Sequence, residues 1–317
     1  MSCVLYLVIP CYNEEEVLPE TSKQLLEKIN SLVQKQKISE KSRIVFVNDG
    51  SKDRTWELIE NLHAQNPVFQ GVKLSRNRGH QNALLAGLMT VKNYCDAAIS
   101  LDADLQDDIN AIDEMVDKFT LENCDIVYGV RSARKTDTFF KKTTAEGFYK
   151  VMNHLGAEVT YNHADYRLMS RRALDGLKQF GEVNLFLRGI VPMIGYKSDC
   201  VYYERKERFA GESKYPLKKM LAFAMEGITS LSTKPIKMIT GLGALIFCIS
   251  FIVFICLLIS RIAGATVNFT TVSVWLTGGL QLIAIGIVGE YVGKVYLETK
   301  HRPKFIIEKY LDDNDKK

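Results

Sequence analysis

Short apolar runs alternate with longer amphipathic stretches over the first two-thirds of the chain. The apolar runs predict strands at 4–9, 43–47, 72–74, 97–101 and 125–130. The stretches between them predict helices over 17–36, from Ser51 or Asp53 to just before Pro67, over 82–93 and over 110–122. The first run is apolar throughout, which indicates a strand covered on both faces. This order predicts an α/β fold of the open, doubly wound type with a mostly parallel sheet.

The last third has a different pattern. Residues 238–260 carry no charge and are long enough to cross about 30 Å of hydrocarbon as a helix. A second apolar stretch at about 269–291 follows a short loop at 261–268, so the two stretches predict a transmembrane hairpin. Basic residues flank both ends of the hairpin, whereas its loop carries only Arg261. The positive-inside rule therefore predicts an integral membrane protein with both termini in the cytoplasm. A buried core hairpin is the alternative.

Apolar residues recur at helical spacing in 216–235, which predicts an amphipathic helix at the membrane surface or a helix packed under the sheet. The predicted domains are thus a cytoplasmic catalytic domain (1–215), a juxtamembrane helix (216–235), the hairpin (236–295) and a cytoplasmic tail (296–317). Such hairpins could pack into a small homo-oligomer.

Composition narrows the class of protein. The net charge of the 317 residues is only +4, which argues against nucleic acid as a partner. The seven cysteines are odd in number and form no C-x-x-C pair, which favours reduced thiols over disulfides or a zinc site. No basic segment precedes the first strand, so no signal peptide is predicted.

Acidic turns follow three of the predicted strands. Asp102 and Asp104 come directly after the strand at 97–101, Asp49 follows 43–47, and Glu14 follows 4–9. In open α/β sheets, ligands bind beyond the carboxyl ends of the strands. Two carboxylates one residue apart suit Mg²⁺ or Mn²⁺ carrying a phosphate, since these ions complete their shell with water and substrate oxygens. The three turns together predict a metal-dependent phosphate site.

Seven segments then resemble one family. The chain is similar to glycosyltransferases of family two with a GT-A fold, and in particular to the polyprenyl-phosphate sugar transferases, which include bactoprenol glucosyltransferases and dolichol-phosphate-mannose synthases. The matching segments are V-I-P-C-Y-N-E (8–14), V-N-D-G-S (47–51), S-R-N-R-G-H-Q (75–81), D-A-D-L-Q (102–106), Y-G-V-R (128–131), D-Y-R-L-M-S (165–170) and E-R-F-A-G-E-S-K-Y (207–215). The chain departs at Asn48, where an Asp is common, and at Asp108, where a Pro often stands.

The resemblance implies roles on the donor side. Asp102, Asp104 and Gln106 are expected to hold Mg²⁺ or Mn²⁺, with Asp104 also catalytic. The residues implied to bind the nucleotide-sugar donor are Pro10, Tyr12, Glu14, Asp49, Arg76, Asp102, Ala103 and Gln106. Some of these have simpler interpretations, because Asn13 and Glu14 also suit a helix start and His80 also suits a surface position.

On the acceptor side, the resemblance implies a lipid phosphate bound by cations and a hydroxyl. The expected residues are Arg131, Arg134, Arg208, Ser213 and Lys214. Guanidinium groups match phosphate oxygens in shape. Asp165 is implied as the catalytic base, yet a phosphate acceptor is already anionic near neutral pH, so Asp165 could instead orient the sugar or pair with Arg167.

The implied activity is inverting transfer of one sugar from a nucleotide-sugar to a polyprenyl phosphate at the cytoplasmic face of a bacterial plasma membrane. UDP-glucose with undecaprenyl phosphate is the first expectation, followed by UDP-N-acetylglucosamine and then GDP-mannose. Transfer to a lipid or protein hydroxyl is an alternative that needs a base. A processive synthase would be expected to carry a Q-x-x-R-W motif, which the sequence lacks. A non-catalytic membrane scaffold fits the intact D-A-D poorly.

Overall fold

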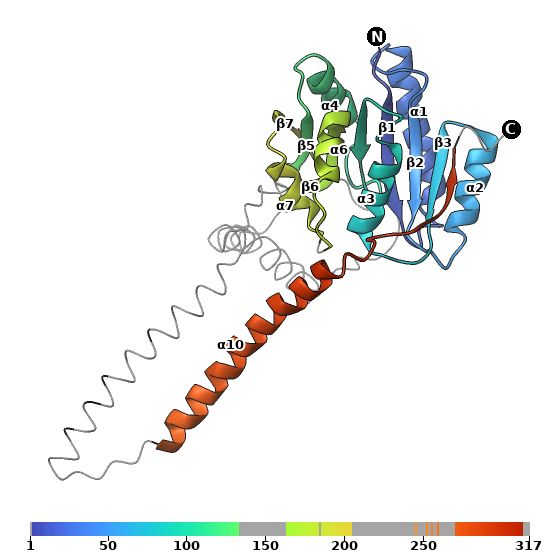
Figure 1. The fold of residues 1–317 in the computed structure, drawn as a ribbon. Coiled ribbons are helices and arrows are strands. Elements are labelled where there is room, and N and C mark those ends of the chain that lie inside the picture. The colour runs from blue at the N-terminus through green and yellow to red at the C-terminus, as the bar shows by residue number, and fades with distance from the viewer. Residues whose placement is uncertain are drawn as a thin grey trace. The chain divides into compact units, whose positions relative to one another are not determined.

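The computed structural model describes residues 2–132, 163–183, 185–204 and 270–312, with single positions at 245, 252, 255 and 259 (Figure 1). Its first elements are β1 (Leu5–Cys11), α1 (Leu18–Gln34), β2 (Arg43–Asn48), α2 (Thr55–Gln65), β3 (Phe69–Leu74), α3 (His80–Val91), β4 (Ala97–Ser100), α4 (Ala111–Thr120) and β5 (Ile126–Arg131). The later elements are β6 (His163–Ser170), α6 (Arg171–Lys178), α7 (Leu187–Met193), β7 (Ser198–Tyr203), α10 (Thr270–Thr299) and β8 (Ile307–Leu311).

All eight strands of these residues belong to one mixed sheet of order β7-β5-β6-β4-β1-β2-β3-β8. β1 pairs in parallel with β2 and β4, and β2 pairs in parallel with β3. β6 runs antiparallel between β4 and β5, and β8 runs antiparallel to β3 at the edge. The predicted α/β class and its first five strands are confirmed. The apolar pattern did not indicate the antiparallel strands β6 and β8, nor β7, which pairs in parallel with β5.

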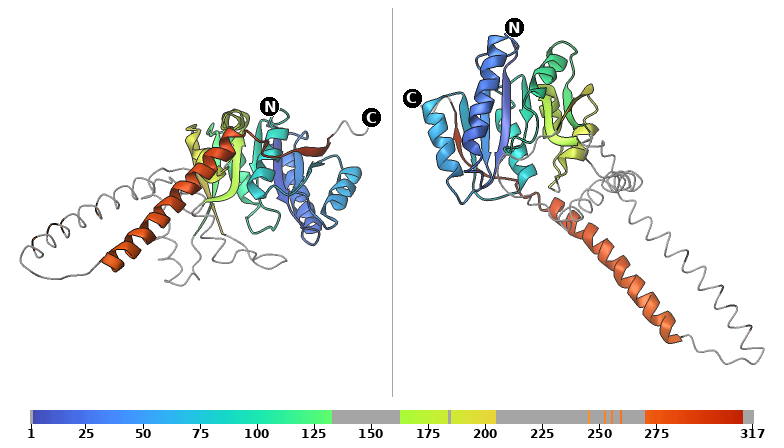
Figure 2. Two further views of the ribbon diagram at one scale, coloured as in Figure 1. Left: turned by 60° about the horizontal axis from the view of Figure 1, so that its bottom comes forward. Right: turned by 180° about the vertical axis from the view of Figure 1, so that it is seen from behind.

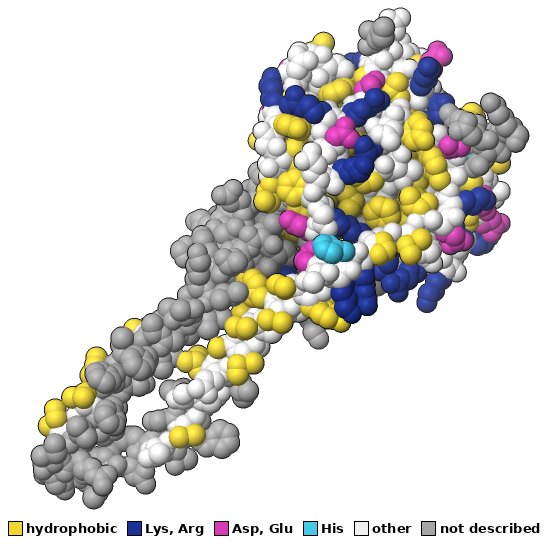
Figure 3. Space-filling view, in the orientation of Figure 1, with side chains coloured by type: hydrophobic (Ala, Val, Ile, Leu, Met, Phe, Trp, Pro, Cys, Tyr) yellow, Lys and Arg dark blue, Asp and Glu magenta, His cyan; other side chains and the backbone are white. Residues whose placement is uncertain are grey.

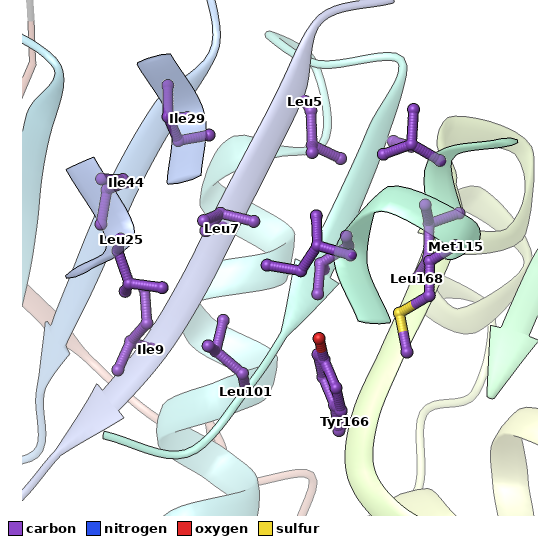
Figure 4. Packing of buried hydrophobic residues seen from close by; sticks show 14 of the residues in the cluster. Leu5, Leu7, Ile9, Leu25, Ile29, Ile44, Leu101, Met115, Tyr166 and Leu168 are labelled. Carbon is purple, nitrogen blue, oxygen red and sulfur yellow. The ribbon is translucent and has the colours of Figure 1, made fainter. Parts of the chain in front are cut away.

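Helices cover both faces of the sheet (Figures 1 and 2). Leu5, Leu7 and Ile9 lie on one side of β1 and belong to the core under α1, α2 and α4 (Figure 4). Tyr6 and Val8 alternate with them and belong to the opposite core, under α3, α6 and α7. Because successive side chains of a strand point to opposite faces, a continuous apolar run fills both cores. This packing fixes the register of β1, and with it the position of the loop that follows.

The loops after β1, β2 and β4 meet at one edge of the sheet. Cys11 at the end of β1 is level with Asn48 at the end of β2, and Val8 is level with Ser100 at the end of β4. The three strands are parallel, so their carboxyl ends lie side by side. The three acidic turns therefore share one edge, as the sequence predicts.

The chain divides into two compact units, and the first is discontinuous in sequence. It comprises Met1–Tyr149, Val159–Pro216 and Pro303–Lys317, while the second comprises Lys150–Glu158 and Leu217–Arg302. Residues 307–311, which were expected in a C-terminal tail, form β8 of the first unit.

The predicted localisation, an integral membrane protein with two spans, is wrong for the part of the chain that the structure describes. No helix there is both long and apolar enough to cross a membrane. Hydrophobic side chains do lie along α10, which occupies the second predicted span (Figure 3). Its polar and charged positions include Thr270, Thr277, Gln281, Glu290, Lys294 and Glu298. The predicted helix at 216–235 and, apart from four single positions, the first predicted span fall outside the described residues.

Candidate active site

The loop after β4 carries Asp102 and Asp104 and is held from two sides. The hydroxyl of Thr21 in α1 donates a buried hydrogen bond of 2.7 Å to the carbonyl oxygen of Ala103. Within the loop, the amide of Gln106 donates to Asp104 Oδ1 at 3.2 Å, and Leu105 adopts a φ of 55°. A bulky residue in the left-handed region is uncommon and indicates a constrained turn. The constraint turns the Asp102–Gln106 segment back on itself at the edge of the sheet.

Asp107 holds the other end of this loop. Its Oδ1 accepts hydrogen bonds from Tyr203 Oη at 2.6 Å and from Arg131 Nε and Nη2 at 3.2 and 2.9 Å. Asp107 is buried, and burial alone lowers the pKa of Arg131, but Asp107 and Tyr203 outweigh it and raise that pKa. Arg131, which the resemblance implies as an acceptor ligand, thus anchors the 102–107 loop in this structure.

The Asp102 carboxyl group fits a divalent cation. Its Oδ1 is buried and accepts no hydrogen bond within the described residues, and the imidazole of His80 lies 3.4 Å from it. Desolvation raises the pKa of Asp102; His80 opposes this, while Asp107, Asp165 and Asp104 add to it. A carboxylate oxygen shielded from water among other carboxylates is costly unless a cation is nearby. The oxygen donors of this loop are those that Mg²⁺ and Mn²⁺ prefer.

Reciprocal hydrogen bonds join the loops after β1 and β2. The amide of Asn13 donates to Ser51 Oγ at 3.0 Å, and Asn13 Oδ1 accepts from the amide of Lys52 at 2.9 Å. The amide of Glu14 donates to Thr55 Oγ1 at 2.9 Å. These bonds make one rigid rim, from which Tyr12 projects into solvent with 38% exposure. A tyrosine ring presented in this way is available for stacking on a planar group.

Asp49 is directed inward from this rim. Its two carboxylate oxygens accept hydrogen bonds from the amides of Arg78 and Gly79 at 2.7 and 2.9 Å. Burial raises the pKa of Asp49, and these two hydrogen bonds oppose the rise. Asp49 therefore holds the 75–79 loop, which presents the exposed Arg76 and leads into α3.

Asp165 in β6 is paired with two guanidinium groups and lies near an imidazole. Arg167 Nη2 lies 2.6 Å from Asp165 Oδ1, and Arg188 Nη2 lies 3.2 Å from Asp165 Oδ2. His80 Nε2 lies 3.7 Å from Asp165 Oδ2 and 3.4 Å from Asp102 Oδ1. Burial alone raises the pKa of Asp165, but Arg188, Arg167 and His80 outweigh it and hold the pKa well below its usual range. Asp165 is therefore ionised and already paired.

The structure brings the expected donor and metal residues together at one edge of the sheet. Of the five expected acceptor residues, it describes only Arg131. Pro10, Tyr12, Glu14, Asp49, Arg76 and the 102–106 segment all follow, or end, strands at one edge. Arg134, Arg208, Ser213 and Lys214 lie outside the described residues. Sequence reasoning missed Asp107 and Arg188. Asp107 adjoins the matched D-A-D-L-Q segment, whereas Arg188 lies in no matching segment.

Comparison with known proteins places the chain among glycosyltransferases. A family model described as Glycosyl transferase family 2 matches residues 6–177. The chain is 55% identical to "Uncharacterized glycosyltransferase YkoT" of Bacillus subtilis (strain 168), over 96% of this chain and 91% of the relative. It is 41% identical to "Bactoprenol glucosyl transferase" of Shigella phage SfV, over 95% of this chain and 97% of that protein.

Solved structures show weaker similarity. A glucosyl-3-phosphoglycerate synthase from Mycobacterium tuberculosis, solved in complex with Mn²⁺, uridine diphosphate and phosphoglyceric acid, is 16% identical with a TM-score of 0.46, over 73% of this chain and 78% of that chain. The family match, by contrast, runs from β1 to α6 and covers the loops after β1, β2 and β4 and the start of β6.

Proposed function

The chain belongs to glycosyl transferase family 2, and we propose that it transfers one sugar from a nucleotide-sugar to a polyprenyl phosphate. The observation that carries this proposal is the 41% identity, over 95% of the chain, to a protein named bactoprenol glucosyl transferase. UDP-glucose is the proposed donor, with UDP-N-acetylglucosamine next, and undecaprenyl phosphate is the proposed acceptor.

Asp102, Asp104 and Gln106 would hold Mg²⁺ or Mn²⁺. The buried Asp102 Oδ1, which accepts no hydrogen bond within the described residues, supports this assignment. When bound, the ion neutralises negative charge that develops on the leaving diphosphate. The contacts of Thr21 with Ala103 and of Arg131 with Asp107 support the loop on both sides. This support favours a pre-organised metal loop.

The rim would bind the nucleoside. Tyr12 is exposed and can stack on a base, and Glu14 can accept from ribose or base donors. Pro10, near the end of β1, and Ala103, in the loop after β4, would line the site with backbone atoms. Asp49 would act through the 75–79 loop that it holds, which carries Arg76. Its two oxygens already accept backbone amides, so we assign it this indirect role.

The reaction is one displacement. An oxygen of the acceptor phosphate attacks the anomeric carbon, the bond from that carbon to the diphosphate oxygen breaks, and configuration inverts. The acceptor is already anionic, because the second pKa of a phosphate monoester is about 6. Asp165 accepts hydrogen bonds from Arg167 and Arg188 and has a depressed pKa, so it suits a positioning role better than that of a base. Holding both substrates in line would contribute more to the rate than an acid–base step.

The acceptor set is also a proposal. Arg131 with Arg134, Arg208, Ser213 and Lys214 would bind the lipid phosphate. Since Arg131 pairs with Asp107 in this structure, it would supply one edge of its guanidinium at most. The other four residues then carry most of the phosphate binding.

A donor panel tests the proposal. The purified chain is incubated with undecaprenyl phosphate, Mg²⁺ and each of radiolabelled UDP-glucose, UDP-N-acetylglucosamine and GDP-mannose, and label entering the organic phase is counted. We expect transfer from UDP-glucose and its loss with EDTA. Asp104→Asn should lower the rate by at least about a hundredfold. Asp108→Asn in the same loop, whose carboxylate bonds Asn110 at the start of α4, is the matched control. Absence of label from all three donors would sink the proposal.

A further inference from the structure

Arg188 is a cation of the candidate site that lies in none of the sequence segments matched to the family. It is the second residue of α7, and its Nε and Nη2 lie 3.4 and 3.2 Å from the two carboxylate oxygens of Asp165. Its side chain is 30% exposed, whereas that of Arg167 on the same carboxylate is 3% exposed. Of the two arginines, only Arg188 is open to a molecule from solvent.

The first turn of α7 is fixed by elements that themselves carry site residues. The amide of Leu187 donates to Gln81 Oε1 in α3 at 2.7 Å, one residue after His80. The carbonyl oxygen of Leu187 accepts from Arg167 Nη1 in β6 at 3.3 Å. Both backbone groups of Leu187 are therefore tied to the site, which sets the position of the next residue, Arg188.

Two guanidinium groups share the carboxylate of Asp165. Asp165 carries one negative charge, because its pKa is held low, and faces the two positive charges of Arg167 and Arg188. The cluster adjoins the loop after β4 through His80, whose Nε2 lies 3.7 Å from Asp165 Oδ2 and 3.4 Å from Asp102 Oδ1. A guanidinium held by a carboxylate keeps its fork in a fixed direction and matches phosphate oxygens.

We propose that Arg188 binds a phosphate group of a substrate, with Asp165 holding its guanidinium in place. The inference rests on the proposed function, in which both substrates carry phosphate: the nucleotide-sugar its diphosphate, and the lipid acceptor its monophosphate. The chemistry recognised is the same in both.

Direct binding tests the proposal without turnover. Calorimetry measures the affinity of the full chain for UDP with Mg²⁺ and, in detergent micelles, for undecaprenyl phosphate. Arg188→Gln should weaken one of these affinities by about tenfold to a hundredfold, since hydrogen bonds to charged groups are worth about that much. Loss toward UDP assigns Arg188 to the donor, and loss toward undecaprenyl phosphate assigns it to the acceptor. Arg188→Lys keeps the charge and should recover part of the loss.

Arg172→Gln is the matched control, because Arg172 also pairs with an aspartate, Asp125, which precedes β5 at the opposite edge of the sheet. It should leave both affinities unchanged. A second comparison uses Asp165→Asn as the background. If Arg188 binds phosphate itself, adding Arg188→Gln weakens binding further.

Unchanged affinity for both ligands in Arg188→Gln, or no further loss in the Asp165→Asn background, would overturn the proposal. Failure of the proposed function is separate. In that case the wild-type chain transfers no sugar from any donor in the panel, whatever Arg188→Gln does to binding.

Discussion

At the scale of single residues, Asp165 shows how the site sets the charge of one group. Burial favours the neutral acid, but two guanidinium groups within hydrogen-bond distance reverse this preference. A carboxyl group whose pKa is lower in the folded chain stabilises the fold above its unfolded pKa, about 3.9. That contribution is lost as the pH falls through the folded pKa. The ion pairs of Asp165 therefore stabilise the protein fully at neutral pH and less in acid.

Replacing Asp165 with Asn should lower the free energy of unfolding at pH 7 by about 3 kcal/mol, because the buried Arg167 loses its counter-charge. Urea titrations of both proteins at pH 7 and pH 3 measure this, and the difference should be smaller at pH 3. Asp175→Asn is the control, since Asp175 pairs with Lys92 on the surface and should change stability by no more than about 0.5 kcal/mol. A difference that grows in acid would contradict the assigned ionisation.

Gly50 gives a second prediction at this scale. It has a φ of 64°, and a Cβ there would lie 2.5 Å from the amide nitrogen of Asn77. Gly195 has a φ of 73°, but the nearest atom to its Cβ would be 4.0 Å away. Gly195→Ala should therefore cost about 1 kcal/mol for backbone strain alone. Gly50→Ala should cost clearly more, because it also pushes away the 75–79 loop, and it should weaken UDP binding. Equal losses in thermal unfolding would refute this close contact.

The sequence predicts which residues of the site are acidic and offers Arg167 as a partner of Asp165, which the structure confirms, but it does not indicate the pairs Arg131–Asp107 and Arg188–Asp165. Asp102, Asp104 and Asp49 are recognisable because each follows an apolar strand. The resemblance implies Arg131 as an acceptor ligand but gives no sign of its contact with Asp107, because Asp107 is 24 positions away and the pairing arises only when β5 folds beside the 102–106 loop. Pairings of this kind depend on tertiary packing, which local patterns do not encode.

At the scale of elements, β8 is one of three strands that the apolar pattern misses, together with β6 and β7. Ile307–Leu311 is five residues long and contains Glu308 and Lys309, so it lacks an apolar run. It pairs with β3, more than 230 positions earlier. Lys73 and Glu60 pair with its two charges at 2.7 and 2.9 Å, which explains how a charged segment lies at a sheet edge. By contrast, β1 and β2 were predictable because they are buried on both faces.

β8 should contribute to stability through one buried side chain. Leu311 is 5% exposed and packs in the core with Ile59 and Phe69, whereas Ile307 on the same strand is 39% exposed. Leu311→Ala should lower the free energy of unfolding by about 2–3 kcal/mol. Ile307→Ala, the matched control, should change it by about 0.5 kcal/mol. Chemical denaturation measures both, and similar values for the two variants would mean that β8 does not dock as described.

At the scale of the whole molecule, the first compact unit is made of three segments, and its last strand follows the second unit in sequence. Residues 303–306 connect to the sheet before β8 begins, since Ser75 donates its amide to the carbonyl oxygen of Ile306 and Lys304 Nζ donates to that of Phe180. Arg78, next to Gly79 in the loop that Asp49 holds, donates to the carbonyl oxygen of Pro303. The returning segment thus supports the 75–79 loop as well as the sheet edge.

This connectivity makes truncation and internal replacement different experiments. A chain that ends at residue 216 lacks β8 and its contacts with β3, so it should be less stable and should bind UDP more weakly. A chain in which a flexible linker of roughly 20 Gly and Ser residues replaces 217–302 keeps the returning segment. The free-energy cost of closing a loop depends only weakly on its length, at about 0.6 kcal/mol per doubling. The linked chain should therefore keep most of the stability and the UDP affinity of the full protein. Urea denaturation and calorimetry compare the three chains. If the linked chain is no more stable than the truncated one, the first unit does not fold as an independent body.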